Sequence, residues 1–255
     1  MGDRQRNGKR IIKRKGIKMN KRLVILLSLF FILLIILIYS NLTKGEYIIK
    51  KFTKIYVATR VQDKTTWLGA SIIQNPCDMW AMQEIITEIK PDFIIETGTF
   101  RGGSAIFFAS ILQNVNKDGR VITVDIIDNT EKASKHELFQ DYVEFIKGDS
   151  VSKEVIDKIA KRIEGASKVT VTLDSDHRKD HVLKELKLYS QFVSINSYLV
   201  VQDTHLDGWG VRKNFEGPMG ALKEFLKINK NFIPDRSREK FLFTWFPEGY
   251  LRRIR

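Results

Sequence analysis

IIETGTFRGGS, residues 94–104, is the stretch that decides the fold of this 255-residue chain. Its apolar start predicts a buried strand, and the AIFFASILQNV that follows predicts a helix. Gly98, Gly102 and Gly103 would let a ligand approach the backbone of the turn, while the helix start offers unpaired N–H groups. The alternative is a tight strand-to-helix turn without a ligand, in which Ser104 caps the helix.

Outward from this turn, short apolar runs alternate with helical patterns. The expected strands are residues 92–96, 120–126, 142–150, 167–176 and 197–204. Helices between such strands are typical of βαβ units and a parallel sheet. Near the C-terminus, residues 240–246, a Pro-Glu-Gly turn and residues 250–255 predict an antiparallel hairpin. We therefore predict an α/β fold with a doubly wound, Rossmann-like, mostly parallel sheet and a C-terminal antiparallel hairpin at one edge.

The positive charge of the chain is concentrated near the N-terminus. The formal net charge is +13, but residues 1–22 contain ten Lys or Arg and one acid, leaving only +4 for the rest. A nucleic-acid-binding surface would need basic residues spread over the domain, so we expect no nucleic-acid partner. Cys77 is the only cysteine, which excludes an intramolecular disulfide.

Residues 23–39 are uncharged and strongly apolar. As a helix, these seventeen residues would span about 25 Å. The alternatives are a signal peptide, which needs a small-residue cleavage site, and a buried core helix, which needs a polar face. We expect a transmembrane helix, a membrane as partner, and an N-terminus placed in the cytosol by the basic residues before it. The side of the membrane that the rest of the chain occupies stays open.

These observations divide the chain into four parts. They are a basic tail (1–22), the transmembrane helix (23–39), a connecting segment (40–75) and an enzyme domain (76–255).

Two acids follow the second and third expected strands. Asp125 lies 22 residues beyond Gly103, the spacing of an acid that binds ribose hydroxyls. This spacing alone does not separate a nicotinamide cofactor from S-adenosylmethionine, although the pattern departs from G-x-G-x-x-G. Asp149 ends the third strand and would face the same crevice, where it could reach an adenine amino group. The alternative is that Asp149 and Ser150 cap the next helix.

The fourth and fifth expected strands also end in acids, Asp174 and Asp203. Adjacent parallel strands would bring them together, and clustered hard oxygen ligands suit Mg²⁺. Both acids could instead cap the helices that follow. His177 is either a catalytic base or a core histidine, and no partner is evident for His205.

Several segments together resemble the cephalosporin hydroxylase family, which includes rhamnosyl O-methyltransferases and has the class I methyltransferase fold. The resemblance covers about residues 67–253. It is carried by IIETGTFRGGS, VDI, KGDS, LDSDHRKDHVLKELKLYSQFVSINSYLVVQDTHLDG and REKFLFTWFPEGYLRRI. It implies that Glu96, Gly98 and Asp125 surround the methionine and ribose of S-adenosylmethionine. It also implies a metal at Asp174 and Asp203.

One position departs from the family pattern. The family usually has Glu-Asp where this chain has Gln202-Asp203, so the metal site, with Gln202 as an amide ligand, loses a negative charge. We predict Mg²⁺-assisted methyl transfer from S-adenosylmethionine to a hydroxyl of a sugar, glycolipid or related small molecule, with His177 as the base. The alternatives are a nicotinamide-dependent oxidoreductase and a non-catalytic membrane protein that retains the fold. Residues 206–220 are expected to form the substrate-side loop, and the oligomeric state stays open.

Overall fold

The computed structural model describes residues 20–255, except for the side chains of residues 38–43. The predicted basic tail therefore lies outside the described residues, apart from residues 20–22. The chain divides into two compact units, Met1–Ile48 and Ile49–Arg255. The second unit contains the sheet and the candidate site.

The first helix, α1, runs without a break from Lys21 to Thr59. None of the helices in the described part of the chain is long and apolar enough to cross a membrane. The predicted transmembrane helix over residues 23–39 is therefore wrong, and so is the prediction of a single-pass membrane protein with a cytosolic N-terminus. The apolar run of residues 23–39 makes about 25 Å of helix, short of the roughly 30 Å hydrocarbon core.

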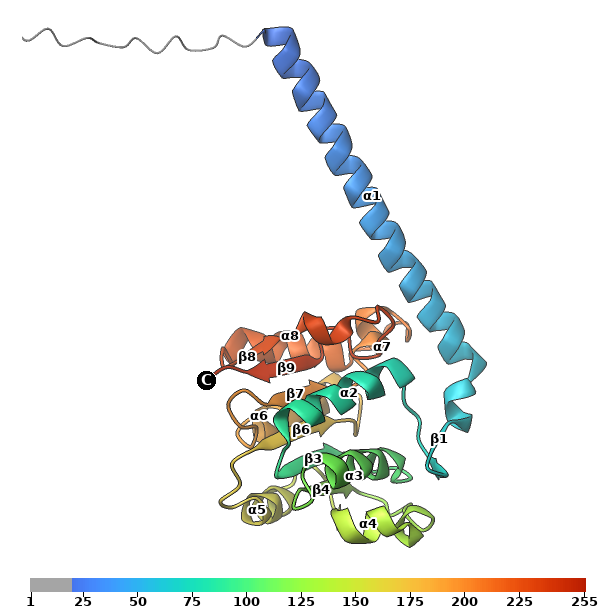
Figure 1. Cartoon of the computed structure of the whole chain (residues 1–255), viewed down its shortest axis with the longest axis vertical. Helices are drawn as coiled ribbons and strands as arrows, with labels where there is room; N and C mark the ends of the chain where they lie inside the picture. Colours follow the sequence, from blue (N-terminus) through green and yellow to red (C-terminus); the bar gives the residue numbers. More distant parts are fainter. Residues whose placement is uncertain (1–19) are drawn as a thin grey trace, which may run out of the picture. The chain divides into compact units, whose positions relative to one another are not determined.

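A seven-stranded sheet forms the centre of the second unit (Figure 1). Its order is β5-β4-β3-β6-β7-β9-β8, and β3 to β7 are parallel neighbours in that order. The strands are β3 (Phe93–Thr97), β4 (Arg120–Asp125), β5 (Val143–Lys147), β6 (Val169–Leu173), β7 (Tyr198–Val201), β8 (Phe232–Pro234) and β9 (Tyr250–Arg253). The predicted α/β fold with a mostly parallel sheet and C-terminal antiparallel strands is confirmed.

The C-terminal antiparallel pairing differs in detail from the predicted hairpin. β9 lies between β7 and β8 and pairs antiparallel with both. Residues 240–246 form no strand. The buried carboxylate of Asp78 accepts hydrogen bonds from the Thr244 hydroxyl and from the Trp245 backbone N–H (2.7 Å). These bonds hold the segment as an irregular loop against the sheet. The Tyr250 hydroxyl of β9 is a third donor to the Asp78 carboxylate (2.8 Å).

Helices cover both faces of the sheet. One face carries α2 (Pro76–Ile89), α3 (Gly103–Val115) and α4 (Glu137–Tyr142), and the other carries α5 (Lys153–Arg162), α6 (Lys179–Tyr189) and α8 (Pro218–Ile228). The remaining elements are short: η1 (Val61–Lys64), β1 (Thr66–Trp67), β2 (Ala70–Ser71), η2 (Ala133–Lys135), α7 (His205–Gly208) and η3 (Arg236–Glu239).

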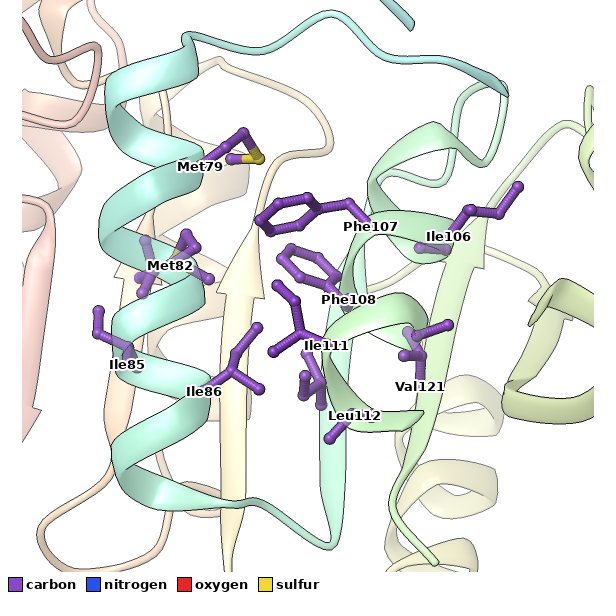
Figure 2. Close-up of a cluster of buried hydrophobic side chains, with 14 of the residues drawn as sticks. Met79, Met82, Ile85, Ile86, Ile106, Phe107, Phe108, Ile111, Leu112 and Val121 are labelled. Atoms are coloured by element: carbon purple, nitrogen blue, oxygen red, sulfur yellow. The ribbon is translucent and has the colours of Figure 1, made fainter. Parts of the chain in front are cut away.

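The packing of α2 against α3 shows why the pattern of apolar residues forms these helices. Met79, Met82 and Ile86 recur at helical spacing on α2 and face Phe107 and Phe108 of α3 (Figure 2). All five side chains are buried, and each contributes about 1.5–3 kcal/mol by leaving water. Asn75 caps α2 by accepting from the Cys77 N–H (2.9 Å), and Pro76 occupies the first turn.

Candidate active site

A cavity of about 580 Å³ opens at the carboxyl ends of the parallel strands. This is where open α/β sheets bind ligands, because the loops after the strands diverge there. The residues that line it and bear on function are Ser71, Gln74, Gly98, Phe100, Gly103, Asp125, Asp149, Ser150, Asp174, Ser175, His177, His181 and Asp203. The tertiary structure thus brings most of the predicted site residues into one cavity, while Glu96, Gly102 and Gln202 do not line it.

Close packing of the backbone requires glycine at two positions of the turn between β3 and α3. Gly98 has a φ of 89°, and a Cβ there would lie 2.0 Å from the Asp174 carbonyl oxygen. A Cβ on Gly103 would lie 2.1 Å from the Ser71 carbonyl oxygen. Gly102 occupies the N-cap of α3 and no side chain caps this helix, so the Ser104 capping alternative is wrong.

Glu96 lies beneath the turn and is completely buried. It accepts a hydrogen bond from the Thr123 hydroxyl (2.6 Å), and its Oε1 has no partner among the described residues. Burial raises the pKa of Glu96 to about 7, against the opposing effect of hydrogen bonds from Ser104 and Thr123. Glu96 is thus placed to support the turn from below, and its implied role near the cofactor stays a prediction.

Asp125 and Asp149 are held by the backbone of nearby loops. Asp125 Oδ2 accepts from the Phe100 N–H (2.9 Å) in the glycine turn, and its Oδ1 accepts from the Ile127 N–H (3.1 Å). Asp149 Oδ1 accepts from the Val151 N–H (3.1 Å). Ser152 caps α5, so the alternative that Asp149 and Ser150 cap it is wrong.

Asp174, His177 and Asp203 form a cluster whose candidate ligand atoms lie within 4.8 Å of one another. His177 Nε2 is 2.7 Å from Asp203 Oδ2 and 4.0 Å from Asp174 Oδ1. The helices that follow these acids, α6 and α7, have no side-chain N-cap bond, so the capping alternative is wrong. His177 is a partly buried cavity residue and not a core histidine.

The charges of this cluster depend on one another. Burial alone would lower the pKa of His177, but the Asp203 carboxylate outweighs it and raises the pKa to about 9. Burial alone would raise the pKa of Asp203, but His177 outweighs it and lowers the pKa. Burial and the neighbouring Asp203 raise the pKa of Asp174. Within the protein alone, Asp203 thus favours the charged form of His177, while burial and Asp203 disfavour the charged form of Asp174.

Gln74 was missed by the sequence reasoning, which treated residues 40–75 only as a connection. Its Nε2 donates to Asp174 Oδ2 (2.9 Å) and to Gln202 Oε1 (2.7 Å). The Gln202 Nε2 in turn donates to the Thr172 hydroxyl (2.8 Å). Gln202, predicted as a metal ligand, therefore has its amide oxygen engaged by Gln74. No local sequence signal marks Gln74, because its partners lie about a hundred residues away.

His205 has a partner that the sequence did not reveal. Its ring stacks on Trp245 with centroids 5.3 Å apart, and its Nδ1 lies 3.0 Å from the Trp245 carbonyl oxygen. The same nitrogen is 3.6 Å from Asp203 Oδ1. Asp203 itself has a φ of 57°, which costs free energy for a residue with a Cβ. His205 and Trp245 thus hold the end of β7 in the conformation that aims Asp203 into the cavity.

The donor set of the cluster fits Mg²⁺. The carboxylates of Asp174 and Asp203 are hard oxygen ligands facing one cavity, and the buried Gln74 Oε1 nearby has no partner among the described residues. A divalent cation there would compete with the His177–Asp203 ion pair.

Comparison with known proteins identifies the family. The family model for rhamnosyl O-methyltransferase/CmcI matches residues 59–254. The chain belongs to this family. It is 35% identical over 216 residues to a rhamnosyl O-methyltransferase of Mycobacterium bovis, covering 82% of this chain and 86% of the relative. A rhamnosyl O-methyltransferase of Mycobacterium leprae is 33% identical over 212 residues, covering 82% and 91%.

Solved structures of this family share the fold. An apo structure of CmcI aligns with a TM-score of 0.58 at 16% identity, covering 76% of this chain and 77% of the other. A CmcI structure with Mg and SAM aligns with a TM-score of 0.57 at 16% identity, covering 76% and 78%. The predicted resemblance and the predicted class of enzyme, an S-adenosylmethionine-dependent methyltransferase, are confirmed, and the oxidoreductase and non-catalytic alternatives are not favoured.

Proposed function

We propose that this protein transfers the methyl group of S-adenosylmethionine to a hydroxyl of a sugar, with a rhamnosyl unit of a glycolipid or related small molecule as the first candidate acceptor. One observation carries the proposal: a single cavity joins the glycine turn and Asp125 to the Asp174, His177 and Asp203 cluster. The names of the relatives supply the acceptor class.

The cofactor would lie along the first part of this cavity. Asp125 is placed to accept hydrogen bonds from the ribose hydroxyls, since the backbone N–H groups that bind it still leave lone pairs on both oxygens. Asp149 is placed to accept from the adenine amino group. Because Gly98 and Gly103 have no Cβ, the turn packs closely against the backbone of Asp174 and Ser71, and we expect the cofactor to lie over the turn. The buried Glu96 would support the turn from the side away from the cofactor.

The methyl acceptor would lie beside His177. In the transfer, the acceptor oxygen forms a bond to the methyl carbon as the carbon–sulfur bond breaks, and the hydroxyl proton passes to the neutral imidazole of His177. Because Asp203 favours the charged form of His177, the neutral form is the minor one near pH 7. Placing the oxygen in line with the methyl group contributes roughly 7–11 kcal/mol.

A bound Mg²⁺ would be held by Asp174 and Asp203. It would lower the pKa of the acceptor hydroxyl. Gln202 would add an oxygen only if its amide released Gln74, because the Gln202 Oε1 accepts from the Gln74 Nε2 (2.7 Å).

The loop after β7 would bind the sugar. Asp207 fixes this loop to the start of α8 by accepting from the N–H groups of Gly217 (3.1 Å), Met219 (3.0 Å) and Gly220 (2.8 Å). Arg212 lies in the loop between these anchors, with its guanidinium over the Phe215 ring. We expect this loop to contact the acceptor on the side of the cavity formed by Asp203.

The proposal is tested with the full-length protein, S-adenosylmethionine and a rhamnosyl glycoside. We expect stoichiometric formation of S-adenosylhomocysteine and of the mono-methylated glycoside, both measured by mass spectrometry. His177→Gln should bind S-adenosylhomocysteine normally and form little product. Failure of the wild-type protein to bind S-adenosylhomocysteine would contradict the proposed cofactor, whereas binding without methylation of any sugar would contradict the acceptor class.

A further inference from the structure

Glu185 is a buried carboxylate that the proposed chemistry does not use. It lies on α6 with its side chain 1% exposed, and it does not line the cavity. Its Oε1 accepts hydrogen bonds from the hydroxyls of Ser150 (2.6 Å) and Ser175 (2.7 Å). These two serines follow β5 and β6, and both line the cavity. Glu185 therefore joins two loops on one wall of the cavity from behind.

The position of the protons on these serines follows from the bonds. Each hydroxyl has one proton, and both protons are directed at Glu185, whose Oε1 accepts from both serines. Ser150 and Ser175 can then offer only lone pairs to a ligand in the cavity. His181 Nε2 lies 3.1 Å from the Ser150 oxygen and must donate to it, since the Ser150 proton is already committed.

Two further contacts hold this arrangement. The Tyr189 hydroxyl donates to the Ser150 carbonyl oxygen (2.8 Å) and fixes the loop against α6. The Glu185 carboxylate raises the pKa of His181, which favours the ring form in which both nitrogens are donors. Asp149, beside Ser150, is also an acceptor. This wall of the cavity thus presents acceptors from Asp149, Ser150 and Ser175.

We propose that Glu185 is a positioning residue that keeps Ser150 and Ser175 as acceptors and so selects the amino group of adenine over an oxo group at the same place. The amino group of adenine can donate to the acceptors of this wall. An oxo oxygen in the same place would face their lone pairs and would make no hydrogen bond with them. The inference rests on the proposed function, which places the adenine of the cofactor at this end of the cavity.

The test compares S-adenosylhomocysteine with S-inosylhomocysteine by titration calorimetry. The inosyl base carries an oxo group in place of the amino group, together with a proton on the neighbouring ring nitrogen. We expect the wild-type protein to bind the adenosyl ligand at least about tenfold more tightly. Glu185→Leu removes the shared acceptor, so the protons of both serines can turn toward the cavity. The preference for the adenosyl ligand should therefore fall about tenfold, whereas a purely structural role would weaken the binding of both ligands equally. Glu164→Leu, at an exposed position, is the matched control and should leave both affinities unchanged.

A second variant makes the test independent of the folding of Glu185→Leu. Ser175→Ala removes one acceptor and should weaken the adenosyl ligand about fivefold more than the inosyl ligand. If the wild-type protein binds neither ligand, both the proposed function and this inference are overturned. If it binds S-adenosylhomocysteine but the ratio of affinities is unchanged in both variants, only the inference about Glu185 is overturned.

Discussion

The two halves of the cavity are built in different ways. The cofactor half, formed by the loops after β3, β4 and β5, holds its acids through local backbone: Asp125 by Phe100 and Ile127, and Asp149 by Val151. The acceptor half, formed by the loops after β6 and β7, holds its acids through side chains: Asp174 by Gln74, and Asp203 by His177. Cofactor binding therefore depends on hydrogen bonds from the backbone of nearby loops, whereas the chemistry depends on contacts between residues that lie far apart in the sequence.

The electrostatics of the two halves differ as well. In the cofactor half, neutral backbone donors satisfy the acids, so each acts independently. In the acceptor half, Asp174, His177 and Asp203 set one another's charge, so a change at one residue alters the other two. Substitutions should therefore separate binding from turnover, and the predictions below run from the largest expected effect to the smallest.

The largest effect is expected at Asp203. Asp203→Asn keeps the shape of the side chain and tolerates the positive φ, but removes the charge that holds His177. Turnover should fall roughly 1000-fold, while the affinity for S-adenosylhomocysteine stays within threefold. Product formation and calorimetry measure the two quantities, with Asp141→Asn as an exposed control. An equal loss of cofactor affinity would show that the two halves are not separable.

The converse effect is expected at Asp125. Asp125→Ala removes the carboxylate proposed to bind the ribose, so the dissociation constant of S-adenosylhomocysteine should rise about 100-fold. Turnover at saturating cofactor should change much less. Asp141→Ala provides the exposed control. Unchanged affinity in calorimetry would remove Asp125 from the cofactor site.

Asp78 tests the long-range support of the acceptor half. It accepts from the N–H of Trp245, whose carbonyl oxygen contacts His205 beside Asp203. In Asp78→Asn, one of the three donors to the carboxylate meets an amide NH₂. The free energy of unfolding in urea at about pH 4 should fall by about 1–2 kcal/mol. Turnover should fall with it, but cofactor affinity should not.

The same residue predicts a pH dependence of stability. Burial raises the pKa of Asp78 to about 7 from an ordinary value of 3.8. Between these values the folded state binds more protons than the unfolded state, so the stabilisation is complete below about pH 4 and is lost as the pH rises to about 7. The difference in unfolding free energy between wild type and Asp78→Asn should shrink over this window. A difference that grows with pH would show that Asp78 stays ionised in the fold.

The smallest effect is expected at Gln202. Gln202→Glu restores the acid that the family usually has there, and a glutamate can still accept from Gln74 while Thr172 turns its hydroxyl to donate. The added charge should tighten Mg²⁺ binding up to about tenfold in calorimetry. Gln74→Glu places a charge next to the same acids from another segment and serves as the comparison. Unchanged affinity in both variants would exclude the Asp174–Asp203 cluster as a Mg²⁺ site.

The sequence alone determined the parts of this protein that depend on neighbouring residues. The strand–turn–helix at residues 94–104, the parallel sheet and the acids at the strand ends all follow from local patterns, because strand order brings the carboxyl ends of parallel strands to one edge. The prediction of a transmembrane helix at residues 23–39 rested on the same kind of local pattern, the apolar composition of the segment, and it was wrong.

Only the tertiary structure decided what those acids contact. The bond from Gln74 to Asp174, the stacking of Trp245 on His205 and the bonds from Ser150 and Ser175 to Glu185 join residues that lie 10 to 100 positions apart. Such contacts depend on how the loops fold over the sheet, and no local pattern encodes them. The pKa of His177 and the engaged amide of Gln202 are consequences of this packing, and they determine which residues are available for chemistry.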